Sequence, residues 1–308
     1  MKRHLIYILG FFLVLALIDV LAGAVFSRLT RLARVGDTAR NEYICNGTHE
    51  DILVLGSSRA IHHYNPAIIS DMTSMSCYNC GQDGNGAILN YGRYHLIAQR
   101  YRPQVVICDV MPEYDLLQGE DNRKFLGWLR PYYDREGIAA IFERVDRTEK
   151  VKMLSQMYRY NSRFIQILSD CVRPMRDDGN HGYVPIEGSL DRMKVDSADG
   201  PIVYTQPVDS LKLYYLAKLM DEAAGSQLIM VVSPCWSGME TAVLQPLKQL
   251  CSQRDIPLLD FSNDPKYVHV DRFFIDAVHL NAVGADEFTR DVMGELKALS
   301  KPIIQKPQ

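Results

Sequence analysis

The sequence predicts an α/β fold in which a parallel sheet is flanked by helices. Short apolar segments alternate with longer segments of helical periodicity along much of the chain. The strand candidates are almost continuously apolar, which is typical of parallel strands covered on both faces. These candidates are residues 52–55, 77–79, 103–110, 228–233 and 257–261.

The amino-terminal segment predicts a membrane anchor. Residues 5–26 are apolar, with Asp19 as the only charge, and a helix of this length crosses a hydrocarbon core of ~30 Å. A cleaved signal peptide is the alternative, because Ala22-Gly23-Ala24 resembles a small-residue cleavage site. The apolar segment is longer than a usual signal core and three arginines follow it directly, so we expect an uncleaved single-pass anchor.

The pattern also predicts how the chain is divided. We expect an anchor at residues 1–30, a linker at 31–50, and an α/β domain at 51–308 with an insertion at about 113–207. The strand–helix alternation stops in this insertion, which is charged and aromatic and carries two expected helices, at 138–155 and 158–172. We expect the main domain to be extracytoplasmic (periplasmic), although the arginines after the apolar segment leave the positive-inside count ambiguous.

Composition argues against several classes of protein. The net charge of −3 gives no electrostatic reason to expect a nucleic-acid partner. Cys77 and Cys80 are the only closely spaced cysteine pair, and no second pair completes a zinc site. We therefore expect no metal and no cofactor. Buried thiols or one local disulfide explain this pair better than a redox site does, which stays the lesser alternative.

Three residues suggest nucleophilic chemistry. Ser58 follows the first strand candidate on a tight turn, which would present it at the carboxyl edge of the sheet. A serine nucleophile needs a base, and the base needs a partner that fixes its tautomer. Asp276 and His279 are three residues apart, so within a turn they lie on the same side. Taken singly, each signal is explained equally well by a helix cap or a surface ion pair.

The order of these signals resembles the SGNH, or GDSL, hydrolase family, in its membrane-anchored bacterial type. The matching stretches are Gly56-Ser57-Ser58, Asn79-Cys80-Gly81, and Asp276-Ala-Val-His279-Leu-Asn281 with Gly284. The resemblance implies a three-layer α/β sandwich, with Ser58 as nucleophile, His279 as base and Asp276 as its orienting partner. It also implies ester hydrolysis or acyl transfer without a metal, often on acylated carbohydrate.

One stretch departs from the family. The family has an asparagine after the third strand that completes the oxyanion hole, and residues 110–115 contain none. Developing negative charge on the acyl oxygen needs preset donors, so we expect the backbone amides of Ser58 and Gly81 to serve. The candidates that replace the missing asparagine are Tyr114, Arg59 and Asn161.

Other polar residues near Ser58 have less specific interpretations. Arg59 either binds an anionic group of the substrate or forms a surface ion pair. His62 and His63 are expected to be surface residues without a carboxylate nearby. Because the asparagine is missing and the insertion is aromatic, a second hypothesis is a catalytically weak scaffold or glycan-binding protein of an envelope polysaccharide system.

Overall fold

The computed structural model describes residues 2–119, 121–173, 179–190 and 200–299. Parts of the expected insertion therefore lie outside the described residues. The chain forms two compact units, the first from residues 1–47 and 125–176, the second from residues 48–124 and 177–308. The first unit thus joins the apolar amino-terminal helix to the central part of the expected insertion.

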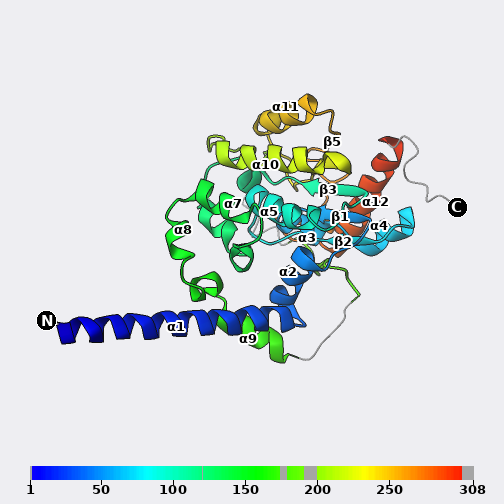
Figure 1. Ribbon diagram of the computed structural model, residues 1–308. Coiled ribbons are helices and arrows are strands. Elements are labelled where there is room, and N and C mark those ends of the chain that lie inside the picture. Colours follow the sequence, from blue (N-terminus) through cyan, green and yellow to red (C-terminus); the bar gives the residue numbers. More distant parts are fainter. Residues whose placement is uncertain (1, 120, 174–178, 191–199, 300–308) are drawn as a thin grey trace. The chain divides into compact units, whose positions relative to one another are not determined.

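The second unit contains a five-stranded, fully parallel sheet (Figure 1). The strand order is β2-β1-β3-β4-β5. The strands are β1 (Ile52–Leu55), β2 (Cys77–Asn79), β3 (Val105–Asp109), β4 (Gln227–Val232) and β5 (Leu258–Asp260). The predicted fold class, an α/β protein with a parallel sheet and an apolar amino-terminal helix, is confirmed. The order in which the chain adds strands switches from one side of β1 to the other between β1 and β3. Open α/β sheets place their ligand-binding and active sites at such a switch point.

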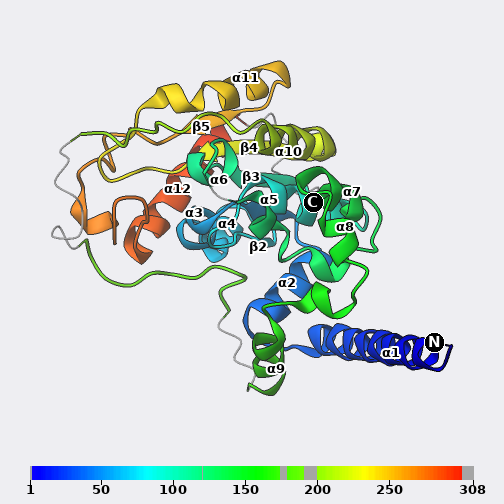
Figure 2. The ribbon, with the colours of Figure 1, turned by 90° about the vertical axis from the view of Figure 1, so that its left-hand side faces the viewer.

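Helices cover the sheet as two groups (Figure 2). In one group α12 (Ala282–Leu299) packs against α3 (Ser58–His63) and α4 (Pro66–Thr73). In the other, α10 (Ser210–Glu222) packs against α5 (Ala87–Ala98) and α11 (Gln245–Gln253). Because strand side chains alternate between faces, every second residue of β1 and β3, including Ile52, Val54 and Ile107, enters the core that also contains Phe288 of α12.

The first unit is helical. It contains α1 (Lys2–Leu32), α2 (Gly36–Asn46), η2 (Arg130–Tyr132), α7 (Ile138–Val145), α8 (Glu149–Lys152), η3 (Met157–Tyr160) and α9 (Phe164–Val172). Residues 36–46, expected as linker, form a helix. The helix expected at 138–155 is broken, because the carboxylate of Asp146 accepts hydrogen bonds from the amide and the hydroxyl of Thr148, both at 2.8 Å, and so favours a turn.

Candidate active site

The turn after β1 presents Ser58. Gly56 has φ +146°, and a Cβ there would lie 2.7 Å from the Cβ of Ala60 and 2.8 Å from the carbonyl oxygen of Asp109. Only glycine fits this combination of backbone angle and close approach. Ser57 is then the N-cap of α3 and Ser58 its first residue, so Ser58 stands at the carboxyl edge of the sheet, where the residue is 9% exposed.

A short loop before α12 carries the other two residues. Phe274 and Leu280 pair in an antiparallel bridge, which closes the loop between them. Inside it, Asp276 Oδ1 accepts hydrogen bonds from the amides of Val278 and His279, each at 2.8 Å. The aspartate is therefore fixed by its own loop, and its second oxygen is left to meet the imidazole of His279.

The three side chains form a continuous hydrogen-bonded relay. Nδ1 of His279 lies 2.8 Å from Oδ2 of Asp276, and Nε2 lies 2.8 Å from Oγ of Ser58. Burial acts to raise the pKa of Asp276, but the hydrogen bonds from the side chain and backbone of His279 hold this pKa below its ordinary value. The aspartate stays ionised at neutral pH, which favours the tautomer of His279 whose Nε2 accepts a proton from Ser58.

Two positioning contacts hold the loop against α3. His63 accepts a hydrogen bond from the amide of Leu280 at its Nε2, 3.0 Å away, and its ring centroid lies 6.2 Å from that of His279. Thr289 of α12 donates to the carbonyl of His63 at 3.1 Å. These contacts join the helix of Ser58 to the loop of His279, and no sequence pattern indicated them.

Asn281 and Gly284, which follow His279 in the sequence, have structural roles at the start of α12. Asn281 Oδ1 accepts from the amide of Gly284 at 2.9 Å, and its Nδ2 donates to the carbonyls of Gly188 and Arg272, each at 2.9 Å. A Cβ on Gly284 would lie 2.2 Å from the carbonyl oxygen of Phe273. Asparagine therefore caps α12 while glycine permits the close approach, and both fix the position of His279.

The expectation for His62 and His63 was wrong. His63 is fully buried, and burial, together with the neighbouring His279 and Arg59, lowers its pKa well below the ordinary value. His62 does have a carboxylate nearby, because its Nε2 lies 3.1 Å from Asp83 Oδ1. Both residues lie on α3, and the sequence could not show which face of this helix the rest of the fold would cover.

The structure gives Gly81 a different contact from the one expected. The amide of Gly81 donates to Asn79 Oδ1 at 3.0 Å, and Asn79 in turn donates to the carbonyls of Ala60 and Tyr64 at 2.6 and 2.9 Å. A Cβ on Gly81 would lie 2.4 Å from the backbone nitrogen of Ile61. Glycine is thus required for close packing against α3, and its amide already has an acceptor within the protein.

Arg59 is buried rather than part of a surface ion pair, so that alternative was wrong. Its side chain is 0% exposed and Nη2 donates to Cys235 Sγ at 3.3 Å, while Nε and Nη1 have no hydrogen-bond partner in the described part of the chain. Burial acts to lower its pKa, but Cys235, Tyr204 and Glu113 raise it above the ordinary value. The guanidinium is a fixed positive charge at the edge of the sheet.

The other two candidates lie in different places. Tyr114 is on α6 (Pro112–Asp115), where Nζ of Lys124 is 5.2 Å from its ring centroid. The same helix carries the buried carboxyl of Asp115, which accepts from the amide of Met111 at 2.7 Å. Asn161 follows η3 in the first unit. Their proposed oxyanion roles stay predictions.

The cysteine pair lies inside the protein. Cys77 and Cys80 are both buried free thiols, and burial raises the pKa of Cys77 well above its ordinary value. A protonated, inaccessible thiol is a poor nucleophile.

Comparisons with known proteins give limited guidance. No family model and no curated protein matches the chain. One solved structure, of a protein assigned to the G-D-S-L lipolytic family from Desulfitobacterium hafniense DCB-2, aligns at 10% identity over 79% of this chain and 97% of its own, with a TM-score of 0.35. Another aligns at 10% identity over 82% and 98%, with a TM-score of 0.39. At these scores neither resemblance bears on function, so function is inferred from the geometry of the Ser–His–Asp relay.

Proposed function

We propose that the protein is a membrane-anchored serine esterase or O-acyltransferase of the SGNH type, acting on acylated carbohydrate or another ester. The observation that supports this is the relay itself, in which Ser58, His279 and Asp276 are joined by two 2.8 Å contacts. Distances of this length are within the reach that a nucleophile and its base require.

The proposed reaction has two halves. His279 Nε2 takes the proton as Ser58 Oγ forms a bond to the acyl carbon, and the same proton passes to the leaving alcohol oxygen when the ester bond breaks. In the second half, His279 deprotonates water or an acceptor hydroxyl as its oxygen bonds to the acyl carbon. The bond from this carbon to Ser58 Oγ then breaks, and His279 returns the proton to Oγ. Asp276 stabilises the imidazolium in both halves. Water as acceptor gives hydrolysis, and a sugar hydroxyl gives acyl transfer.

A fluorophosphonate probe tests the nucleophile. We expect the probe to label the wild type and Ser57→Ala, and to leave Ser58→Ala unlabelled. Ser57 is a matched control because it is the adjacent serine but is 0% exposed, with its hydroxyl 3.4 Å from Met111 Sδ. Equal labelling of the wild type and Ser58→Ala would exclude Ser58 as the nucleophile.

A second candidate function is a catalytically weak scaffold or glycan-binding protein. The bond from the Gly81 amide to Asn79 supports it, because one expected oxyanion donor is already occupied, and losing such a donor costs about 10²–10³ in rate. This candidate predicts glycan binding that is unchanged in His279→Ala, with no turnover of a simple acetyl ester. Measurable turnover that depends on His279 would reject it.

We also propose that α1 is retained as a single-pass anchor, with the main domain extracytoplasmic. The helix is long enough and apolar enough to span a membrane, with a mean hydropathy of 2.7 in its best window. Contacts within the first unit support retention, because cleavage after Ala24 would remove both Asp19 and Gly23, which meet residues 155–157. The intact mass of the membrane-extracted protein distinguishes the two, and a mass lacking the first 24 residues would reject the anchor.

A further inference from the structure

One face of α1 is packed against the rest of the first unit. Asp19, Gly23 and Phe26 recur at helical spacing. The ring centroid of Phe26 lies 4.6 Å from that of Phe164, and a Cβ on Gly23 would lie 2.3 Å from the Cβ of Gln156. The carboxyl half of α1 is therefore part of a folded unit. Lipid can surround only the remaining part of the helix on all sides.

Asp19 marks the position along α1 at which other residues of the first unit begin to pack against the helix. Its carboxylate accepts from Ser155 Oγ at 2.6 Å and from the amides of Gln156 and Met157 at 2.7 and 3.1 Å. It thereby satisfies donors at the start of η3, as an N-cap residue would. The only charged side chain in the apolar segment thus forms its hydrogen bonds inside the first unit.

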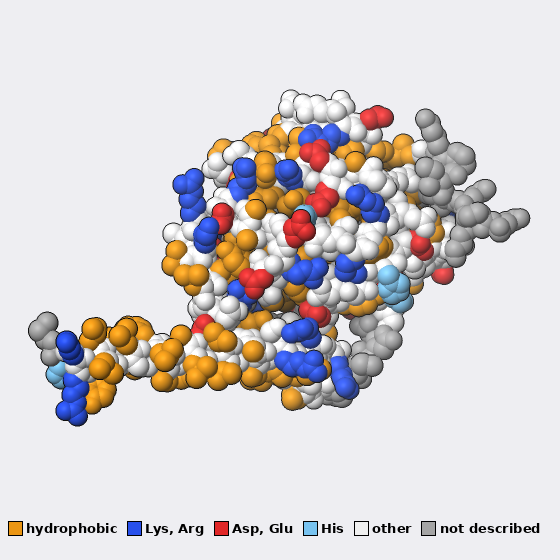
Figure 3. All heavy atoms as spheres, in the orientation of Figure 1, with side chains coloured by type: hydrophobic (Ala, Val, Ile, Leu, Met, Phe, Trp, Pro, Cys, Tyr) orange, Lys and Arg blue, Asp and Glu red, His pale blue; other side chains and the backbone are white. Residues whose placement is uncertain are grey.

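The part of α1 that is exposed on all sides is shorter than a bilayer core, although Val20, Leu21 and Val25 beyond Asp19 are also 55–57% exposed. From Leu5 to Ile18 every large apolar side chain is 44–72% exposed, which Figure 3 shows as a continuous apolar surface along the helix. Residues 5–18 extend over roughly 21 Å at 1.5 Å per residue, whereas the hydrocarbon core is ~30 Å thick. For the exposed apolar face up to Val25 to lie within the membrane, the segment bonded to Asp19 on the packed face must enter the interface; otherwise the bilayer must thin.

The segment bonded to Asp19 has the side chains that such a position needs. Val151 and Leu154 are 68% and 79% exposed, and Leu154 precedes the serine that Asp19 binds. Lys150 precedes Val151 with its side chain 66% exposed, and long basic side chains reach back to the head groups from such positions.

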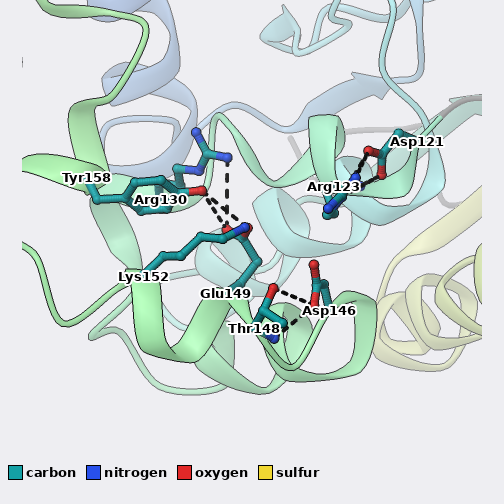
Figure 4. Close-up of polar contacts among 8 residues, drawn as sticks. All are labelled: Asp121, Arg123, Arg130, Asp146, Thr148, Glu149, Lys152 and Tyr158. Atoms are coloured by element: carbon teal, nitrogen blue, oxygen red, sulfur yellow. Dashed lines mark hydrogen bonds and ion pairs between the residues drawn. The ribbon is translucent and has the colours of Figure 1, made fainter.

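Polar contacts join residues on either side of this segment (Figure 4). Glu149, which is 1% exposed, accepts from Nζ of Lys152 at 2.6 Å and from the hydroxyl of Tyr158 at 3.2 Å. The guanidinium of Arg130 lies 4.8 Å from the ring centroid of Tyr158. The two ends of the segment are therefore fastened to each other, and its apolar side chains are presented without a large entropic penalty on binding.

We propose that residues 151–157 form a membrane-interface rim, in which Val151 and Leu154 insert among the lipid head groups and upper acyl chains at the level set by Asp19. The inference rests on the proposed anchor and not on the proposed chemistry. The occupant of this surface is lipid, because Asp19 bonds the rim directly to the proposed membrane-spanning helix.

Tryptophan depth measurements on the full chain in nanodiscs test the rim. Leu154→Trp is compared in bilayers whose acyl chains are brominated or unbrominated, with the two native tryptophans subtracted using the wild type. Leu13→Trp, on the exposed apolar face of α1, reports whether the anchor spans. Val172→Trp is the matched control, because Val172 is 82% exposed in the same unit but follows Cys171, whose thiol donates to the carbonyl of Leu29. Leu29 lies about 15 Å further along α1 than Asp19, so Val172 is expected well outside the membrane core.

We expect bromine to quench Leu13→Trp and Leu154→Trp and to leave Val172→Trp emitting as before. Quenching of Leu13→Trp without quenching of Leu154→Trp would reject the proposed rim while supporting the proposed anchor. The exposed apolar side chains of the rim would then point to a protein partner instead of lipid. Equal quenching at Leu154 and Val172 would also overturn the proposed rim, because contact would not be confined to the rim. Absence of quenching at Leu13 would reject the anchor and the rim together. The same tryptophan variants are also measured in the Ser58→Ala background. Their quenching then tests the rim independently of whether Ser58 is a nucleophile.

Discussion

Two sets of polar side chains lie at the carboxyl edge of the same sheet. One is the relay of Ser58, His279 and Asp276. The other is Ser233 after β4, which donates its hydroxyl to Asp109 at the end of β3, where the hydroxyl of Tyr64 also donates at 2.7 Å. Both sets combine a serine with an aspartate, yet their surroundings differ completely.

Burial separates the two sets. Ser233, Asp109 and Tyr64 are all 0% exposed, and burial raises the pKa of Asp109, with Arg59 opposing the rise. In the relay, the side chains of His279 and Asp276 are 22% and 51% exposed, and an imidazole stands between serine and carboxylate. A buried carboxylate bonded directly to hydroxyls stabilises a core, whereas a serine bonded to a partly exposed imidazole has a proton acceptor and is suited to chemistry.

The largest effect is expected for Ser58→Ala. Removing the nucleophile should lower kcat/KM for a simple aryl ester by at least about 10⁴-fold, measured by release of the aryl alcohol. Ser233→Ala is the counterpart in the buried set and should leave the rate per folded molecule unchanged. The comparison fails if the two alanine variants lose similar amounts of activity.

Asp276→Asn should have the next largest effect. The amide keeps an oxygen for the loop amides but turns a donor toward His279, which favours the wrong tautomer, so kcat should fall by about 10³–10⁴-fold. The split between kcat and KM gives a readout that a structural change alone would not produce, because KM should stay near its wild-type value when the lost interaction is made in the transition state. A variant with wild-type kcat at every pH would remove Asp276 from the relay.

Asp115 tests how burial affects a third carboxyl near this edge. Burial raises its pKa to about 7, with Asp109 adding to the rise and Lys212 opposing it. The folded state therefore holds a proton that the unfolded state releases near its ordinary pKa, so the free energy of unfolding should fall as pH rises from about 4 to about 7, by up to about 4 kcal/mol.

Urea unfolding of the wild type and Asp115→Asn as a function of pH checks this expectation. The asparagine retains an oxygen for the Met111 amide but does not titrate, so the stability difference between the two proteins should shift in favour of the variant as pH rises. A difference that is constant from pH 4 to 7 would show that Asp115 titrates normally.

The smallest effect is expected for Tyr64→Phe. The change removes one donor from buried Asp109, which should lower the free energy of unfolding by about 1–3 kcal/mol, measured in urea. Activity per folded molecule should stay at the wild-type value. Loss of activity without loss of stability would show that the buried set acts in the chemistry.

Much of the fold followed from local pattern. The apolar runs and the tight turn before Ser58 each depend on residues close in sequence, so the strands were predicted, with helices expected between them. The Asp-x-x-His spacing likewise places Asp276 and His279 together within one loop. The insertion was predicted less well, because the side-chain bonds between Asp146 and Thr148 and between Asp19 and residues 155–157 interrupt its helices.

The sequence by itself determined the alternation of parallel strands and helices, the apolar amino-terminal helix and the local pairing of Asp276 with His279, because these depend on periodicity and on short spacings. Only the tertiary structure brought Ser58 within 2.8 Å of His279, buried Arg59 and His63, and gave the amide of Gly81 its partner in Asn79. Those outcomes depend on how α3, α12 and the strand ends pack, and a contact across more than two hundred residues leaves no local pattern.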